Sequence, residues 1–211
     1  MYTYTHLIGR AGHWLLDRVV GGLAATGIHP NALTSIGLVV NIWAGVLLAA
    51  DRFLAAAVAI FLAGLVDLTD GKVARRQGRT TTFGAFYDSM IGRYSDMVLY
   101  MGLIIHFAII GRFFYVVLTA VAMMSSFMVS YSQARAESLI PSCRVGFMER
   151  PERMALLIVG AVFDRMAPVL WVIAIFSTWT VVHRIIYTWQ ETAAGRTLGA
   201  KIANEGGSGR R

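Results

Sequence analysis

The chain has 211 residues, of which 56% are hydrophobic and only 15% are charged. This composition excludes a soluble globular domain. The formal net charge of +7 does not indicate a nucleic-acid partner, because in so apolar a chain Lys and Arg set the membrane topology and meet anionic lipid. Apolar stretches such as residues 55–66 are continuous rather than alternating, which favours helices over a transmembrane β-barrel. We therefore predict an all-α polytopic membrane protein.

The first 25 residues mix apolar and charged side chains. The pattern is too interrupted for a membrane span or the core of a signal peptide, and it predicts an N-terminal interfacial amphipathic helix over residues 1–25. Gly27 and Pro30 then interrupt this helix. The first span opens at residues 29–34, where we expect Asn31 to act as the helix cap.

Six apolar segments follow, and we expect six transmembrane helices at about 32–50, 53–75, 80–110, 113–137, 151–166 and 167–189. The fifth is the least apolar, because only Met154 to Phe163 is free of charge. Arg52, Arg112 and Arg165 stand singly at the tight links, whereas the other Lys and Arg gather at the termini and in the two long links. The positive-inside rule then places both termini and the long links in the cytoplasm.

The last residues differ from the rest of the chain. From residue 193 to residue 211 the apolar periodicity is lost and the sequence becomes Gly-rich and basic. We predict one membrane domain over residues 1–192, followed by a flexible basic tail over residues 193–211.

The candidate chemistry lies in residues 65–96, LVDLTDGKVARRQGRTTTFGAFYDSMIGRYSD. Asp67 and Asp70 are three residues apart, so on a helix both carboxylates project from one face. Asp88, at the corresponding end of the next span, can face them. Three carboxylates suit Mg²⁺ or Mn²⁺, hard cations that also bind substrate phosphates. Gly71, Ala74 and Gly84 are small where a bulky side chain would block helix packing or the entry of a phosphate.

The spacing Asp67-x2-Asp70-Gly71-x2-Ala74-Arg75-x8-Gly84-x3-Asp88 resembles the signature of the CDP-alcohol phosphotransferases, and it matches seven of the eight signature residues. The resemblance implies a homodimeric, six-span enzyme with a cytoplasmic cavity. A phosphatidyl group would pass from CDP-diacylglycerol to an alcohol with release of CMP. Asp67, Asp70 and Asp88 would hold two metal ions. The nucleotide would meet Pro30, Asn31, Thr34, Asp67, Gly71, Ala74, Arg75 and Gly84.

The eighth signature position is Gly92, where the family has a fourth aspartate that ligates metal and deprotonates the acceptor hydroxyl. Asp96 lies one turn further along the same helix and is not an obvious replacement. Three interpretations stay open: an engineered inactive variant, a natural member with an altered site, or a chain in which another base serves. The catalytic positions to compare are therefore Asp88 and Gly92.

The acceptor is predicted from basic residues near the ends of the last three spans. Arginine forks bind phosphate through two parallel hydrogen bonds, which favours a phosphorylated alcohol such as inositol phosphate or glycerol phosphate. Residues 130–137 and 149–153 resemble the bacterial phosphatidylinositol phosphate synthases, although those enzymes have Lys at the position of Gln133. The acceptor would meet Gln133, Arg135, Arg153 and Arg184.

Other interpretations compete with this one. The aspartates could form a buried ion-pair network with Lys72, Arg75 or Arg93, and the arginines could serve only topology and lipid contact. A channel or transporter would need acidic residues at several depths, whereas here they cluster at one membrane face. A member that binds nucleotide and metal without turnover is also consistent with Gly92.

Overall fold

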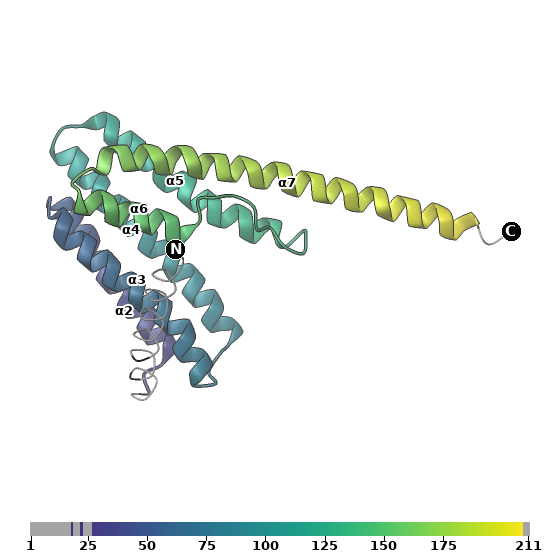
Figure 1. Cartoon of the computed structure of the whole chain (residues 1–211), viewed down its shortest axis with the longest axis horizontal. Coiled ribbons are helices and arrows are strands. Elements are labelled where there is room, and N and C mark those ends of the chain that lie inside the picture. The colour runs from purple at the N-terminus through teal and green to yellow at the C-terminus, as the bar shows by residue number, and fades with distance from the viewer. Residues whose placement is uncertain (1–17, 19–21, 23–26, 209–211) are drawn as a thin grey trace, which may run out of the picture. The chain divides into compact units, whose positions relative to one another are not determined.

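The computed structural model describes residues 18, 22 and 27–208 (Figure 1). Its described part is helical and contains no strand, so the all-α prediction is confirmed there. The helices are α2 (Pro30–Ala49), α3 (Phe53–Arg76), α4 (Thr82–Ile109), α5 (Phe113–Ala136), α6 (Arg150–Val162) and α7 (Met166–Ser208). The predicted interfacial helix lies outside the described residues.

Four of the described helices are long and apolar enough to cross a membrane: α2, α3, α5 and the Met166–Ala194 part of α7. This composition is that of a multi-pass membrane protein. The other two described helices, α4 and α6, are not long and apolar enough by the same measure. Helix α4 carries Arg93 and Asp96 beside its apolar part, and α6 has 13 residues, which rise only about 20 Å in a hydrocarbon core of about 30 Å.

The chain divides into two compact units, and each is described by itself. The first comprises Met1–Phe113 and Ala161–Asp164, and the second comprises Phe114–Gly160 and Arg165–Arg211. In the first unit α2 packs against both α3 and α4. The crossing of α2 and α4 is close, because a Cβ on Gly102 would collide with the backbone of Gly45. Glycine at these two positions lets the two backbones touch.

The start of α2 differs from the prediction that Asn31 caps it. His29 is the N-cap, and its Nδ1 accepts a hydrogen bond from the Asn31 N–H at 3.2 Å. The helix begins at Pro30, whose fixed φ suits the first helical position and whose missing N–H costs nothing there. The cap is therefore one residue before this proline, and Asn31 already belongs to the first turn.

The links between the helices have the predicted tightness. Asp51 and Asp164 adopt positive φ values of 62° and 52° in the α2–α3 and α6–α7 turns, and Gly111 does so at 70° before α5. Helix α4 begins after the side chain of Thr81, which accepts a hydrogen bond from the Gly84 N–H at 2.9 Å. This cap fixes the start of the helix that carries Asp88.

In the second unit α5 and α7 are joined by a hydrogen bond between the hydroxyls of Ser125 and Thr178 at 3.0 Å. Helix α7 continues to Ser208, past residue 193, where we expected the helical pattern to end. Residues 193–203 contain Ala, Arg, Leu and Lys, which are good helix formers without an apolar face. The helix therefore continues beyond the point where its apolar stripe ends. The flexibility of the tail stays a prediction.

Candidate active site

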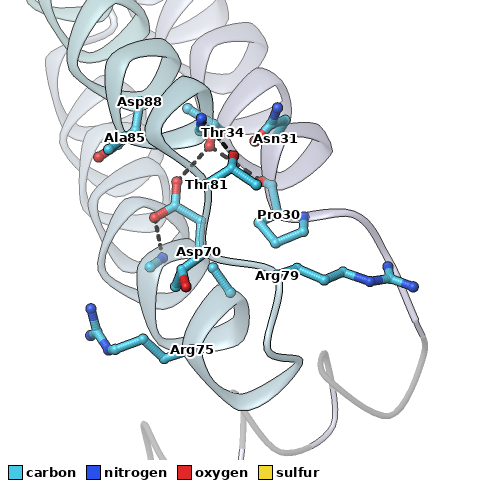
Figure 2. Close-up of a pocket in the computed structure, with 13 residues that line it drawn as sticks. Pro30, Asn31, Thr34, Asp70, Arg75, Arg79, Thr81, Ala85 and Asp88 are labelled. Atoms are coloured by element: carbon cyan, nitrogen blue, oxygen red, sulfur yellow. Dashed lines mark hydrogen bonds between the residues drawn. The ribbon is translucent and has the colours of Figure 1, made fainter.

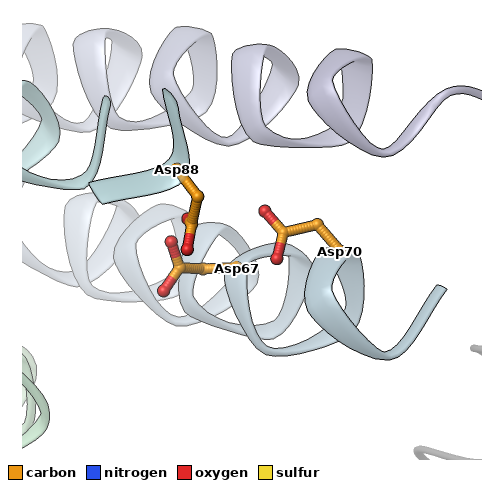
Figure 3. A group of neighbouring side chains, drawn as sticks. All are labelled: Asp67, Asp70 and Asp88. Atoms are coloured by element: carbon orange, nitrogen blue, oxygen red, sulfur yellow. The ribbon is translucent and has the colours of Figure 1, made fainter. Parts of the chain in front are cut away.

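The carboxylates of Asp67, Asp70 and Asp88 lie together in the first unit. Each offers a ligand oxygen, and these three atoms lie within 4.8 Å of one another. Asp67 and Asp70 come from α3, whereas Asp88 comes from α4, and Figure 3 shows the three side chains pointing toward one another. The expected juxtaposition is therefore present. A set of only carboxylate oxygens fits a hard divalent cation such as Mg²⁺ or Mn²⁺.

Both oxygens of the Asp70 carboxylate accept hydrogen bonds. The Thr34 hydroxyl on α2 donates to Oδ2 at 2.7 Å, and the backbone N–H of Gly71 donates to Oδ1 (Figure 2). Asp70 and Thr34 are only 4% and 6% exposed. A buried carboxylate is stable only where donors satisfy its oxygens, so these two groups hold Asp70 in a single orientation.

A pocket opens beside Asp70 and Asp88 (Figure 2), with a cavity volume of about 220 Å³. Most residues that the sequence assigned to the nucleotide line it: Pro30, Asn31, Thr34, Gly71, Ala74, Arg75 and Gly84. The pocket has walls from α2, α3 and α4 and is contained in the first unit. These predicted residues, far apart in sequence, therefore share one cavity.

The small residues of the signature have different surroundings. A Cβ on Gly84 would lie 3.0 Å from Thr81 Oγ1 and 3.4 Å from Asn31 Oδ1, so that position is tight. A Cβ on Gly71 would meet only Arg75 Nη1 at 3.8 Å. Gly84 is therefore needed for packing at the start of α4, whereas Gly71 leaves the pocket wall open.

Four residues of the pocket wall were not predicted from the sequence, namely Arg79, Thr80, Thr81 and Ala85. Arg79 was interpreted only as a topology signal. It lies on the α3–α4 link, and its Nη1 donates to the Gly27 carbonyl oxygen at 3.4 Å. Figure 2 shows Arg75 and Arg79 extending to opposite sides, away from the Asp70 carboxylate. The shortness of the α3–α4 link is the sequence signal that could have indicated the residues that were not predicted. A short link must pass the ends of both helices that carry the aspartates.

Gly92 lies on α4 one turn beyond Asp88 and is buried. Asp96, one further turn along, is buried too. The described site thus contains three of the four carboxylates of the family signature, and the fourth position has no side chain.

The predicted acceptor residues lie in the second unit. Arg153 and Arg184 are each only 1% exposed. Nη1 of Arg153 donates to the Met148 carbonyl oxygen at 3.1 Å. Gln133 and Arg135 are on the last turns of α5 and make local hydrogen bonds, to Glu137 at 3.2 Å and to Ser138 at 3.3 Å.

Arg184 holds the segment between α5 and α6 in place. Its Nε donates to the Val145 carbonyl oxygen at 2.9 Å, its Nη1 to the Val129 carbonyl oxygen, and its Nη2 lies 3.4 Å from Glu149 Oε1. Guanidinium carries five N–H groups, so these contacts use three of them. This structural use of Arg184 was not predicted from the sequence.

Gly146 and Thr180 bring the same segment close to α7. Gly146 has a φ of +108°, and a Cβ there would collide with Thr180 Cγ2. The Thr180 hydroxyl accepts a hydrogen bond from the Met148 N–H at 3.2 Å. The order of the segment before α6 therefore depends on two side chains of α7, Thr180 and Arg184.

Comparison with known proteins identifies the family. Residues 27–193 match the family model described as CDP-alcohol phosphatidyltransferase. The chain is 34% identical over 164 residues to an archaetidylinositol phosphate synthase of Methanothermobacter thermautotrophicus, covering 75% of this chain and 82% of that protein. It is 31% identical over 188 residues to a phosphatidylinositol phosphate synthase of Mycobacterium tuberculosis, covering 83% of this chain and 86% of that protein.

The fold agrees with solved structures of the Mycobacterium tuberculosis enzyme. The structure with CDP-DAG bound superposes with a TM-score of 0.76 at 29% identity, covering 82% of this chain and 93% of that chain. The structure in complex with manganese and citrate gives a TM-score of 0.75, covering 82% of this chain and 88% of that chain. The family match favours a phospholipid-synthesising transferase over a channel or transporter. The chain belongs to the CDP-alcohol phosphatidyltransferase family of membrane enzymes.

Proposed function

We propose that this protein transfers a phosphatidyl group from CDP-diacylglycerol to a hydroxyl of a phosphorylated alcohol and releases CMP. The observation that carries the proposal is the three-carboxylate cluster at the edge of a pocket lined by the family's signature residues. The acceptor oxygen forms a bond to the β-phosphorus, the bond from that phosphorus to the CMP oxygen breaks, and the hydroxyl proton passes to a base.

Asp67, Asp70 and Asp88 are the proposed ligands of two Mg²⁺ or Mn²⁺ ions. When bound, such ions neutralise the charge of the pyrophosphate and of the departing CMP. The carboxylates supply the hard oxygen ligands, and Thr34 and the Gly71 N–H keep Asp70 oriented. A manganese complex of the Mycobacterium tuberculosis relative supports this choice of cation.

The nucleotide end is proposed to occupy the pocket between α2, α3 and α4. Asp67 would act on it only as a metal ligand, while the seven predicted lining residues and Arg79 would surround it. Arg75 and Arg79 contribute positive charge at the rim, which favours an anionic pyrophosphate lipid. The CDP-DAG complex of the relative supports the same donor for this chain.

Inositol phosphate is the favoured acceptor, with glycerol phosphate next. The names of the relatives, phosphatidylinositol phosphate and archaetidylinositol phosphate synthases, support the first. Gln133, Arg135, Arg153 and Arg184 are the proposed acceptor residues. The two N–H groups of Arg184 beyond its three contacts are sufficient for one bidentate phosphate contact.

A second function is favoured by one specific observation, the glycine at position 92. Without a carboxylate there, the chain would bind CDP-lipid and metal and turn over slowly or not at all. Asp88 remains in the site as a ligand, and the acceptor proton must reach another base. Measured turnover of the chain with Gly92 would favour the interpretation in which another base serves, whereas its absence would favour an inactive or altered site.

The proposed membrane arrangement is six spans, in which α4 and α6 also cross, with an interfacial helix over residues 1–25. Both termini and the site face the cytoplasm, following the charge asymmetry of the links. A homodimer in a bacterial-type inner membrane is the proposed assembly.

The experiment that tests the activity is CMP release from CDP-diacylglycerol against a panel of acceptors: inositol phosphate, glycerol phosphate, inositol, serine and choline. The chain with Gly92 and its Gly92→Asp variant are run in parallel. We expect CMP release with phosphorylated acceptors and little with plain alcohols. Equal release with serine or choline would contradict the proposed acceptor class.

A further inference from the structure

The side chain of Thr34 on α2 contacts an aspartate of the cluster. Its hydroxyl donates to Asp70 Oδ2 at 2.7 Å and also lies 3.3 Å from the Pro30 carbonyl oxygen. A hydroxyl has one proton, and the charged carboxylate at the shorter distance is the stronger acceptor. The contact therefore joins two buried side chains that are 36 residues apart.

The bond fixes an orientation that the backbone of α3 alone leaves open. The Asp70 carboxylate can rotate about its last side-chain bond, because such torsions are broad. Gly71 N–H holds Oδ1, but it is the next residue on the same helix and moves with it. Thr34 comes from a different helix and holds Oδ2, so it ties the carboxylate to α2.

We propose that Thr34 is a positioning residue for the metal cluster, acting through Asp70. This inference rests on the proposed metal site, and it goes beyond a contact between Thr34 and the nucleotide. Outer partners that orient a ligand typically change metal affinity by about 10 to 100-fold when they are removed. A nucleotide contact would leave metal affinity unchanged in the absence of nucleotide.

The neighbouring hydroxyl supplies a matched control. Ser35 Oγ lies 2.9 Å from the Tyr87 hydroxyl on α4, and it also donates to the Asn31 carbonyl oxygen at 2.9 Å. It thus links α2 to another helix as Thr34 does, but it does not contact an aspartate of the cluster. Ser35→Ala removes an interhelix hydroxyl of the same kind from the same turn.

The test is Mn²⁺ binding to the purified full chain in detergent, without nucleotide, followed by the signal of free Mn²⁺ in electron paramagnetic resonance. We expect Thr34→Val to weaken Mn²⁺ binding about 10 to 100-fold, whereas Thr34→Ser and Ser35→Ala stay within about threefold of the unchanged chain. Far-UV circular dichroism checks the helices. If Thr34→Val does not fold, Thr34→Ala removes the same hydroxyl without branched bulk.

Unchanged Mn²⁺ affinity in Thr34→Val or Thr34→Ala would overturn the inference and leave the metal site standing. An equal loss in Ser35→Ala would also overturn it, because the effect would then belong to helix packing. If the unchanged chain itself binds no Mn²⁺, the proposed metal site fails, and the positioning role fails with it.

Discussion

The acidic region of the first unit and the basic region of the second use their charged side chains differently. In the first, three carboxylates converge within 4.8 Å beside a pocket, an arrangement that repels unless a cation is shared. In the second, which contains Arg153 and Arg184, Arg184 donates three of its N–H groups to two backbone carbonyl oxygens and to Glu149. Like charges brought together indicate a ligand, whereas a buried arginine can be explained in part by the fold.

The largest effect is expected at the missing carboxylate of the acidic region. Gly92→Asp places a base one turn from Asp88 and should raise CMP release at least about a hundredfold, since general-base catalysis contributes about 10² to 10⁴ in rate. The measurement is single-turnover CMP release with inositol phosphate. Gly92→Asn is the control, because it adds similar bulk without a base. Equal rates in the aspartate and asparagine variants would exclude a base role for this position.

Asp70→Asn should weaken metal and CDP-lipid binding together. The change removes one charged ligand from the cluster, and such an interaction contributes about 1.5 to 3 kcal/mol, or roughly 10 to 150-fold in affinity. Titration of Mn²⁺ and of CDP-diacylglycerol by calorimetry checks both. A lower affinity for lipid with unchanged affinity for Mn²⁺ would assign Asp70 to the nucleotide alone.

Arg184→Ala should affect both stability and acceptor binding, unlike any change in the acidic region. Loss of its contacts to Val129, Val145 and Glu149 frees the segment before α6, so the thermal midpoint should fall. The acceptor KM should rise by the equivalent of about 1.5 to 3 kcal/mol, with less effect on CDP-diacylglycerol. Differential scanning fluorimetry and steady-state kinetics measure the two effects.

Arg165→Ala is the matched control for Arg184, because Arg165 is an exposed arginine of the same unit at the α6–α7 turn. It should leave both quantities unchanged. A stable Arg184→Ala protein with normal acceptor KM would refute both roles of the side chain. Equal rises in the KM of acceptor and lipid would leave only the structural role.

The smallest effects separate packing glycines from pocket glycines within the first unit. Gly102→Ala overfills the contact with Gly45 and should cost about 1 to 3 kcal/mol of stability. Gly71→Ala meets only Arg75 Nη1 at 3.8 Å, so it should leave the thermal midpoint unchanged and raise the KM for CDP-diacylglycerol. A fall in thermal midpoint for Gly71→Ala alone would reverse this assignment.

The sequence predicted the helices and the aspartate cluster because both depend on local pattern. Apolar runs placed each helix start within about two residues, and a spacing of three on one helix with Asp88 on the next was sufficient for the cluster. The hydrogen bond from Thr34 to Asp70 was not predictable, because it depends on how α2 crosses α3. The contacts of Arg184 depend in the same way on where a loop returns to α7.

The most direct test of the central claim is metal-dependent transfer at the three aspartates. Four proteins are compared: Gly92→Asp, and Gly92→Asp combined with Asp67→Asn, Asp70→Asn or Asp88→Asn. Each is incubated with radiolabelled CDP-diacylglycerol and inositol phosphate, either with Mn²⁺ or with EDTA. We predict CMP and phosphatidylinositol phosphate only in the Mn²⁺ sample with all three aspartates intact. Release of CMP that persists in EDTA, or that survives loss of these carboxylates, would contradict the account.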